Sequence, residues 1–366
     1  MRRDSWSGMP WYSFREIRAR FNDTVLVDTP RLDRVVERFA SLQRYGLSVR
    51  QRRLLGALYR RIIDARLEQI QPDVVLSIGA AHKLMGLESK WPLIHVTDGY
   101  FATIVNYYDK YRYFSRDVKR AGHEDYQSFI DNASMSLFAS EWARDSALGL
   151  YRMDQGRVRV VPFGANLDQD PGRRERQRGD RLKILFVGYD WQRKGGELVL
   201  ATWRLLRAQL PDCELHIVGC QPQTAMGLAG VHVHGRLDKA KPADFARLTG
   251  LFDSSSLFFM PSRAEAFGMV FCEAASYGLP VVATATGGVP TVVREGETGL
   301  LLPLEAGPAA YAERILALWR DATGYVRMTM AARARYETTL NWHAWGEAVE
   351  DAVETVLEQR AATIAA

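Results

Sequence analysis

Residues 261–303 read PSRAEAFGMVFCEAASYGLPVVATATGGVPTVVREGETGLLLP. The apolar run before this stretch predicts a strand that ends at Pro261, and helical spacing of apolar residues follows from about Met269 to Tyr277. Gly268, just before this helix, allows the backbone to approach a ligand closely. A further strand is predicted over Pro280–Ala283. Strand, glycine turn, helix and strand in this order predict a parallel α/β sheet, because a parallel pair needs a long crossover.

The same alternation extends in both directions along the chain. In the second half the other expected strands are Lys183–Val187, Glu214–Val218, Val231–His234 and Leu257–Met260, with a helix over Glu197–Gln209. In the first half we expect strands at Thr24–Val27, Val74–Ile78, Leu93–Val96, Met135–Ala139 and Val158–Pro162, with helices such as Leu54–Gln69. Two such series predict two Rossmann-like, doubly wound domains that face each other across a cleft, with ligands outside the carboxyl ends of the strands.

The domain boundaries are expected where the composition changes. We predict an N-terminal domain over 1–168, a polar linker over 169–181, a C-terminal domain over 182–340 and a helix over 341–366 that packs back on the first domain. The chain starts with a glycine turn at Gly8 and a helix-like stretch, so the usual first strand is absent or the sequence starts too far downstream.

Composition and charge exclude several classes of protein. Of 366 residues, 47% are hydrophobic and 25% charged, which excludes general disorder. Three cysteines make no disulfide framework, and neither a secretory signal nor a membrane-spanning run occurs, so the sequence predicts a cytosolic protein. Residues 1–178 carry 30 Lys and Arg against 22 Asp and Glu (+8), and residues 179–366 carry 18 against 21 (−3). The basic half suits an anionic acceptor or membrane surface, and no basic tract interleaved with aromatics indicates nucleic acid.

Two carboxylates and one amine are the candidate catalytic groups. Glu265 precedes the helix after Gly268, and Glu273 lies two turns into it, so both can face one ligand. Carboxylates suit sugar hydroxyls, and the free N–H groups at a helix start favour an anion. Lys194 stands just before a second helix, which opens at Gly195-Gly196.

These residues resemble the signature of the retaining glycosyltransferases of the GT-B fold, the family 4 or "group 1" enzymes. The E-x7-E pattern is Glu265…Glu273, and about 40 contiguous residues agree in kind and order. Further matches are Gly278-Leu279-Pro280, Gly287-Gly288-Val289-Pro290, Gly296-Glu297-Thr298-Gly299, Val161–Asn166, Ser140–Ala143, Phe186–Gly196 and His234–Leu237. The resemblance is strong over about 158–303 and weaker before that.

The resemblance implies roles for residues of the second domain. Glu265 would contact the transferred sugar, Glu273 would bind the ribose, and Lys194 would bind the diphosphate. The backbone of Phe267, Gly268 and Met269 would contact sugar and phosphate, and Gly235 would lie near the base. Many members carry an Arg where this chain has Tyr189, so Arg193 is expected to supply that guanidinium.

For the first domain the resemblance implies an acceptor site. Family members often have a His-Asp pair after a strand, and this chain reads His95-Val96-Thr97-Asp98. Asp98 is therefore the catalytic candidate, while His95 points to the other face of the strand and is more often structural. Gly8 resembles the glycine turn that faces the donor phosphates.

Metal and cofactor motifs are set aside. Asp168-Gln169-Asp170 spells DxD, but two acids in a polar linker are usually solvated, and GT-B enzymes need no metal ion. The seven histidines show no metal-ligand spacing: His232 and His234 alternate on a strand, and neither has an acidic companion nearby. We therefore expect neither a metal nor a cofactor.

The function implied is transfer of a sugar, with retention, from a nucleoside-diphosphate donor to a glycan, lipid-linked or small-molecule acceptor. A nucleotide-sugar epimerase and a non-catalytic sugar-nucleotide-binding protein are the alternatives. The arginines of 50–66, beside Leu54, Leu55 and Leu58, suit peripheral attachment to the inner membrane face, although the segment also fits a core-facing helix.

Overall fold

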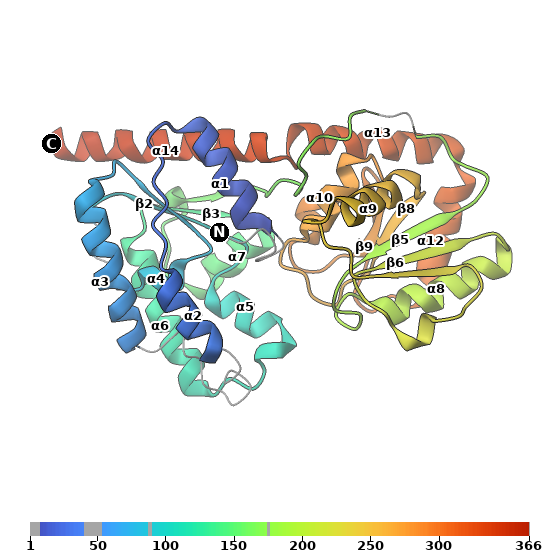
Figure 1. The fold of residues 1–366 in the computed structure, drawn as a ribbon, viewed down its shortest axis with the longest axis horizontal. Helices are drawn as coiled ribbons and strands as arrows, with labels where there is room; N and C mark the ends of the chain where they lie inside the picture. The colour runs from blue at the N-terminus through green and yellow to red at the C-terminus, as the bar shows by residue number, and fades with distance from the viewer. Residues whose placement is uncertain (1–7, 40–52, 87–89, 174–175, 366) are drawn as a thin grey trace. The chain divides into compact units, whose positions relative to one another are not determined.

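The structure is a computed structural model that describes residues 8–39, 53–86, 90–173 and 176–365. The chain forms two compact units (Figure 1). The N-terminal unit comprises Ser13–Val161 and Gly346–Ala366, and the C-terminal unit comprises Met1–Tyr12 and Pro162–Trp345. Ser7 of the predicted glycine turn and residues 50–52 of the predicted basic segment lie outside the described residues.

The N-terminal unit contains a sheet of four parallel strands in the order β1-β2-β3-β4. Their bounds are β1 Val75–Ile78, β2 Leu93–Thr97, β3 Met135–Phe138 and β4 Val158–Val160. Each lies on an expected strand, shifted at its ends by one or two residues. The expected strand at Thr24–Val27 is wrong: those residues form no strand, and Val25 and Leu26 are exposed. A short apolar run without a neighbouring strand edge has no ladder to join.

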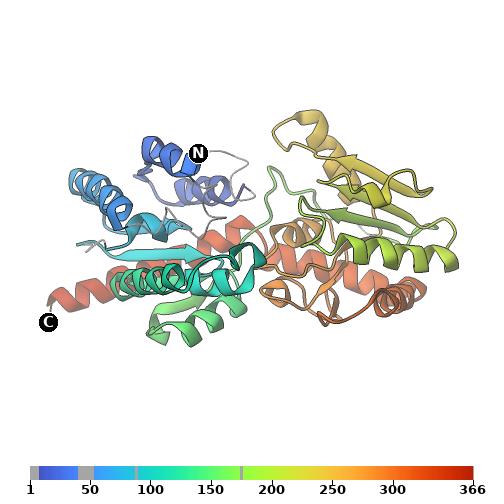
Figure 2. The ribbon, with the colours of Figure 1, turned by 90° about the horizontal axis from the view of Figure 1, so that it is seen from below.

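Helices cover both faces of this sheet (Figure 2). They are α1 Met9–Arg20, α2 Pro30–Phe39, α3 Arg53–Ile70, α4 Ala81–Leu84, α5 Phe101–Tyr107, α6 Arg116–Asn132 and α7 Glu141–Leu150, with 3₁₀ turns at Asp109–Tyr111 and Gln155–Arg157. The stripe Tyr59, Ile63 and Leu67 of α3 is buried in the core with Phe129 and Phe138. Among the described residues, no helix has the length and apolar character that crossing a bilayer requires.

The C-terminal unit contains six parallel strands in the order β10-β9-β8-β5-β6-β7. They are β5 Lys183–Val187, β6 Glu214–Val218, β7 Val231–Gly235, β8 Leu257–Met260, β9 Val281–Thr284 and β10 Gly299–Leu302. Counted within the unit this is the order 6-5-4-1-2-3 of a doubly wound Rossmann sheet, and the order reverses between β5 and β8. The expected strands match β5 to β9 closely, whereas no strand was predicted at β10.

The helices of this unit are α8 Gly196–Gln209, α9 Pro242–Ser254, α10 Met269–Ser276, α11 Val289–Val292, α12 Pro308–Arg320 and α13 Ala322–Thr338, with a 3₁₀ turn at Gln223–Ala225. The last helix, α14 Trp342–Ala365, begins in this unit. Helices lie on both faces of the sheet (Figure 2). The central strands β5, β8 and β9 are almost entirely buried, as a parallel sheet covered on both sides requires.

The polar composition of residues 169–181 predicted a linker between the two domains. In the structure this segment belongs to the C-terminal unit. Asp170 accepts two hydrogen bonds of 2.7 Å from Arg333 on α13. Arg176 donates to the backbone oxygens of Phe252, Asp253, Ser255 and Tyr277. The charged side chains of this segment thus fasten it to the C-terminal unit, because they satisfy carbonyl groups at the ends of α9 and α10.

The chain changes unit within α1, after β4 and within α14, so the predicted boundaries at 168 and 341 shift. Tyr12 on α1 stacks on Trp342 and donates to Asp168 at 3.2 Å, which fixes the start of α1 to the C-terminal unit. From Gly346 onward α14 belongs to the N-terminal unit. There Arg20 pairs with Glu350 at 2.9 Å. All of α14 after its first four residues is thus part of the unit that the first half of the chain builds, as the prediction that this helix packs on the first domain requires.

Candidate active site

The topological switch point of the C-terminal sheet places two loops side by side. The loop 188–195 leaves the carboxyl end of β5, and the loop 261–268 leaves that of its neighbour β8. The backbone N–H of Arg263 donates to the carbonyl of Arg193 at 2.7 Å, which joins the two loops. The carbonyl of Glu265 accepts from Gly288 at 3.0 Å, which ties in the loop after β9. Ligands of doubly wound sheets bind at such a position.

Lys194 and Glu265, 71 positions apart in sequence, meet here in an ion pair. Their side chains are only 12% and 11% exposed. The Ser262 hydroxyl donates to the same carboxylate oxygen at 3.4 Å, and Arg193 Nη1 lies 3.7 Å from it. Burial lowers the pKa of the Lys194 ammonium, although the negative charge of Glu265 opposes this shift.

Two glycines allow these loops to fold so tightly. Gly195 caps α8 with φ 74°, and a Cβ at this position would lie 2.1 Å from the carbonyl oxygen of Pro261. Gly268 caps α10 with φ 92°, and a Cβ at this position would clash with the ring of Phe271. Phe267 is buried and Met269 begins α10, so its first-turn N–H groups start where the sequence predicted.

Glu273 occupies a second, separate ion pair. Its side chain, 6% exposed, pairs with the Lys239 ammonium, which lies between β7 and α9. Sequence reasoning missed Lys239, because no spacing rule joins it to a residue 34 positions away. Gly235 ends β7 with φ 67°, as a tight turn at a strand end requires.

Two arginines are candidates for the guanidinium group that was expected at position 189. Arg193 Nη1 donates to the carbonyl of Ala264 at 2.8 Å, and its Nε lies 3.3 Å from Asp190. The Arg236 guanidinium lies over the exposed Tyr189 ring, 5.3 Å from its centroid. Arg236 was not singled out in the sequence, although its position directly after Gly235 at the carboxyl end of β7 is a signal that could have found it.

The candidates from the first part of the chain divide between the two units. Asp98 follows the carboxyl end of β2 and is half-buried. His95 is buried within β2, where its ring contacts Ser77 Oγ at 3.1 Å and stacks on Tyr100. Burial lowers the pKa of His95 to about 3. Gly8 precedes α1 with φ 88° and, with residues up to Tyr12, belongs to the C-terminal unit.

The two acids of the DxD sequence accept hydrogen bonds from other side chains of the C-terminal unit. Asp168 accepts from Tyr12, and Asp170 is held by Arg333, which lowers the pKa of its carboxyl.

Comparison with known proteins connects this geometry to a family. Residues 181–321 match the family described as glycosyl transferases group 1. A D-inositol 3-phosphate glycosyltransferase of Corynebacterium glutamicum (strain R) is 28% identical over 272 residues, which are 69% of this chain and 64% of that protein. The enzyme of the same name from Mycobacterium bovis (strain BCG / Pasteur 1173P2) is 30% identical over 59% of this chain and 47% of its own length. The chain therefore spans less than two thirds of these relatives.

The fold comparison covers more of the chain. An Anabaena protein solved in complex with UDP and glucose is 16% identical, with a TM-score of 0.57 over 97% of this chain and 95% of that one. The predicted α/β fold of the GT-B type, with two Rossmann-like domains, is confirmed, and so is the resemblance of the C-terminal unit to the group 1 glycosyltransferases.

Proposed function

We propose, from the match of residues 181–321 to the group 1 glycosyltransferases, that this protein transfers a sugar from a nucleoside-diphosphate donor to an acceptor hydroxyl. The observation that carries the proposal is the buried Lys194–Glu265 pair at the switch point of the C-terminal sheet. Relatives named as glycosyltransferases and a fold shared with a protein solved with UDP and glucose support it.

The pair offers both charges that such a transfer uses. When a donor binds, its diphosphate takes the Lys194 ammonium as a partner, and the Glu265 carboxylate is released to accept hydrogen bonds from the sugar hydroxyls. Glu273 accepts from the ribose, and the ion pair with Lys239 orients that carboxylate. Arg193 and Arg236 supply guanidinium groups in place of the arginine expected at Tyr189.

The transfer proceeds with retention in this proposal. The bond between the anomeric carbon and the phosphate oxygen breaks, and the acceptor oxygen attacks the same face of the oxocarbenium-like sugar. The acceptor proton passes to the departing phosphate oxygen, so no carboxylate nucleophile is needed. Lys194 stabilises the leaving diphosphate as the negative charge on it grows, which is the electrostatic effect that lowers such barriers most. Asp98 is the proposed polar group on the acceptor side, and the reaction uses no metal ion.

The test is a panel of UDP-, GDP- and ADP-sugars, with release of nucleoside diphosphate as the readout. Inositol phosphates, glycans and lipid-linked saccharides serve as acceptors, and NMR of the product gives the anomeric configuration. Glu265→Ala is expected to abolish transfer while circular dichroism shows an intact fold. Glu297→Ala, which changes an exposed glutamate of the same unit, is the matched control and keeps full activity.

Three results would contradict the proposal. Full turnover by Glu265→Ala would show that transfer does not require Glu265. Conversion of the donor sugar without an acceptor would indicate an epimerase. Thermal stabilisation by a donor without diphosphate release under any acceptor would indicate a binding protein.

Peripheral attachment to an anionic membrane is proposed for α3. Leu55 packs against the core, so it does not face outward as the sequence suggested, and the side chain of Leu54 lies outside the described residues. Leu58 and Ile62 are 47% and 42% exposed, and Arg61 and Arg66 are exposed beside them. Co-sedimentation with anionic vesicles at low salt, lost at high salt, is expected, and no binding at low salt would end this idea.

A further inference from the structure

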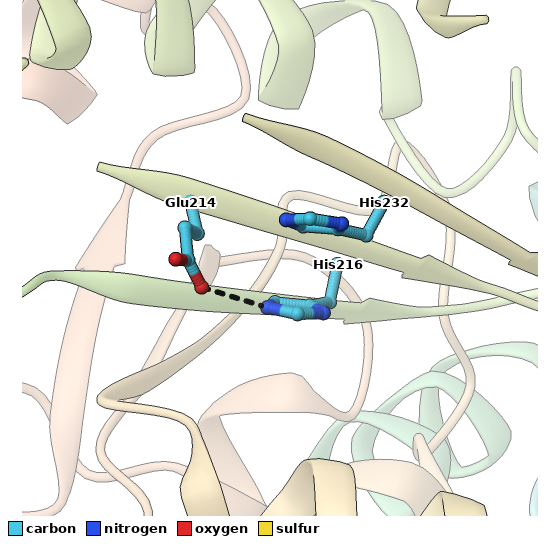
Figure 3. Close-up of side chains that lie close together, drawn as sticks. All are labelled: Glu214, His216 and His232. Atoms are coloured by element: carbon cyan, nitrogen blue, oxygen red, sulfur yellow. Dashed lines mark hydrogen bonds and ion pairs between the residues drawn. The ribbon is translucent and has the colours of Figure 1, made fainter. Parts of the chain in front are cut away.

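Polar side chains gather on one face of the last two strands of the C-terminal sheet. Glu214 and His216 alternate with the buried Leu215 and Ile217 on β6, so they share the opposite face. His232 and His234 occupy the same face of the edge strand β7, where His216 is in direct register with His232. The register of the two strands thus supplies the acidic neighbour that the histidines of β7 lack in the sequence (Figure 3).

Three of these side chains have the spacing of a metal site. One ligand atom each from Glu214, His216 and His232 lies within 4.8 Å of the other two. Glu214 Oε2 and His216 Nε2 are 3.4 Å apart. In a tetrahedral zinc site with bonds of about 2.0–2.1 Å, neighbouring ligand atoms are about 3.3 Å apart, so this pair already has the spacing of two ligands. The imidazoles of His216 and His232 are stacked, with ring centroids 4.7 Å apart (Figure 3). Binding of one ion by both rings therefore requires the side chain of His232, which is exposed, to rotate.

Two cations lie near the Glu214 carboxylate. Arg181 Nη1 lies 3.5 Å from Glu214 Oε1, so this cation engages the other oxygen of the carboxylate. Lys183 on β5 also acts on Glu214 through its charge. These two cations repel a metal ion and so weaken its binding. The two strands favour binding, because they hold the ligands at fixed spacing and so lower the entropy cost of bringing them together.

The second nitrogen of His216 has a partner as well. His216 Nδ1 lies 3.0 Å from His234 Nε2, and Arg247 lies 2.8 Å from His234 Nδ1. Without a metal, the hydrogen bonds run from Arg247 through His234 and His216 to Glu214. With a metal on Nε2, the hydrogen of His216 resides on Nδ1 and is donated to His234 Nε2, as the outer partner of a metal-bound histidine should accept it. His234 then carries its own hydrogen on Nδ1, so Arg247 gives up its hydrogen bond.

We propose that Glu214, His216 and His232 bind one divalent transition-metal ion of the zinc class, with water as the fourth ligand. Two imidazoles and one carboxylate are a donor set that suits Zn²⁺, Co²⁺ and Ni²⁺ and not the oxygen-seeking Mg²⁺. The ion links the edge strand β7 to β6 and stabilises the C-terminal unit. It lies toward the amino ends of these strands and takes no part in the proposed transfer, so the inference does not depend on the proposed function.

The test uses the full chain purified without a polyhistidine tag and treated with a chelator. Isothermal titration with Zn²⁺ is expected to show one equivalent bound, and Zn²⁺ is expected to raise the melting temperature of the C-terminal unit by several degrees. His232→Ala and Glu214→Gln should each weaken binding at least tenfold and remove the melting shift. His343→Ala, which changes an exposed histidine on α14, is the matched control and should bind like the unchanged chain.

Co²⁺ gives an independent readout, because its visible spectrum reports tetrahedral nitrogen and oxygen ligands. A thiolate charge-transfer band would assign the ion to a cysteine and overturn the proposal. No saturable binding at millimolar Zn²⁺, or unchanged affinity in His232→Ala, would also overturn it. His232 is exposed on an edge strand, so its replacement leaves the fold intact.

Discussion

Lys194 and Glu265 form a nearly dry ion pair, and a double-mutant cycle tests whether they depend on each other as the structure indicates. Lys194→Met leaves the Glu265 carboxylate with the Ser262 hydroxyl at 3.4 Å and Arg193 at 3.7 Å as its polar neighbours. Removing one partner of a buried pair costs about 3–5 kcal/mol, and these two neighbours place the cost near 3 kcal/mol. Glu265→Gln should cost a similar amount, because Lys194 loses the charge that opposes its desolvation.

The double variant Lys194→Met with Glu265→Gln buries no charge. It is therefore expected to cost no more than either single variant, which gives a coupling of about 3 kcal/mol. Hydrogen exchange followed by mass spectrometry on peptides from β5 and β8 reports the opening free energy of the C-terminal unit alone. The control is Arg294→Gln, which breaks an ion pair whose side chains are about half exposed and should cost no more than about 0.5 kcal/mol. Single-variant costs that simply add in the double variant would refute the reasoning.

Further expectations concern backbone strain, pH and the fastened segment. Gly195→Ala forces a Cβ against the carbonyl oxygen of Pro261 and should lower the stability of the unit by more than about 3 kcal/mol. Gly227→Ala, with the same φ of 74° and open space around it, should lower it by only about 1 kcal/mol. Equal losses of stability in hydrogen exchange would contradict this. His95 has a folded pKa of about 3, below its unfolded value, so the unfolded state binds the extra proton. Stability should therefore fall as pH drops from about 6.5 toward 3, and the stability difference between the unchanged chain and His95→Gln should shrink by about 1.4 kcal/mol per pH unit; a constant difference in urea unfolding would contradict it. Arg176→Ala leaves four carbonyl groups without their cation and should cost about 3 kcal/mol, and unchanged exchange of α9 would show that the segment is only loosely attached.

Local patterns in the sequence determined much of the C-terminal unit. The apolar runs at β5, β6 and β8 were bounded correctly, because short β-rich runs between turn residues leave little choice. Gly195 and Gly268 were placed at helix starts because glycine adopts positive φ without steric cost. The sequence was less reliable where the pattern was weak. Thr24–Val27 has the composition of a strand but no partner strand. β10 was not predicted, because it directly follows a turn that contains glycine.

Only the tertiary structure decided which of these elements are neighbours. Lys194 meets Glu265 because β5 lies beside β8 although β6 and β7 come between them in the chain. Glu214 meets His232 because β7 pairs with β6 in one register, and a shift by one residue would turn these side chains to opposite faces. The helical pattern likewise predicted α14, but tertiary contacts such as that of Glu350 assign all of it from Gly346 onward to the N-terminal unit. Periodicity and steric preference act over a few residues and can be read along the chain, whereas strand order and register arise from packing between distant segments.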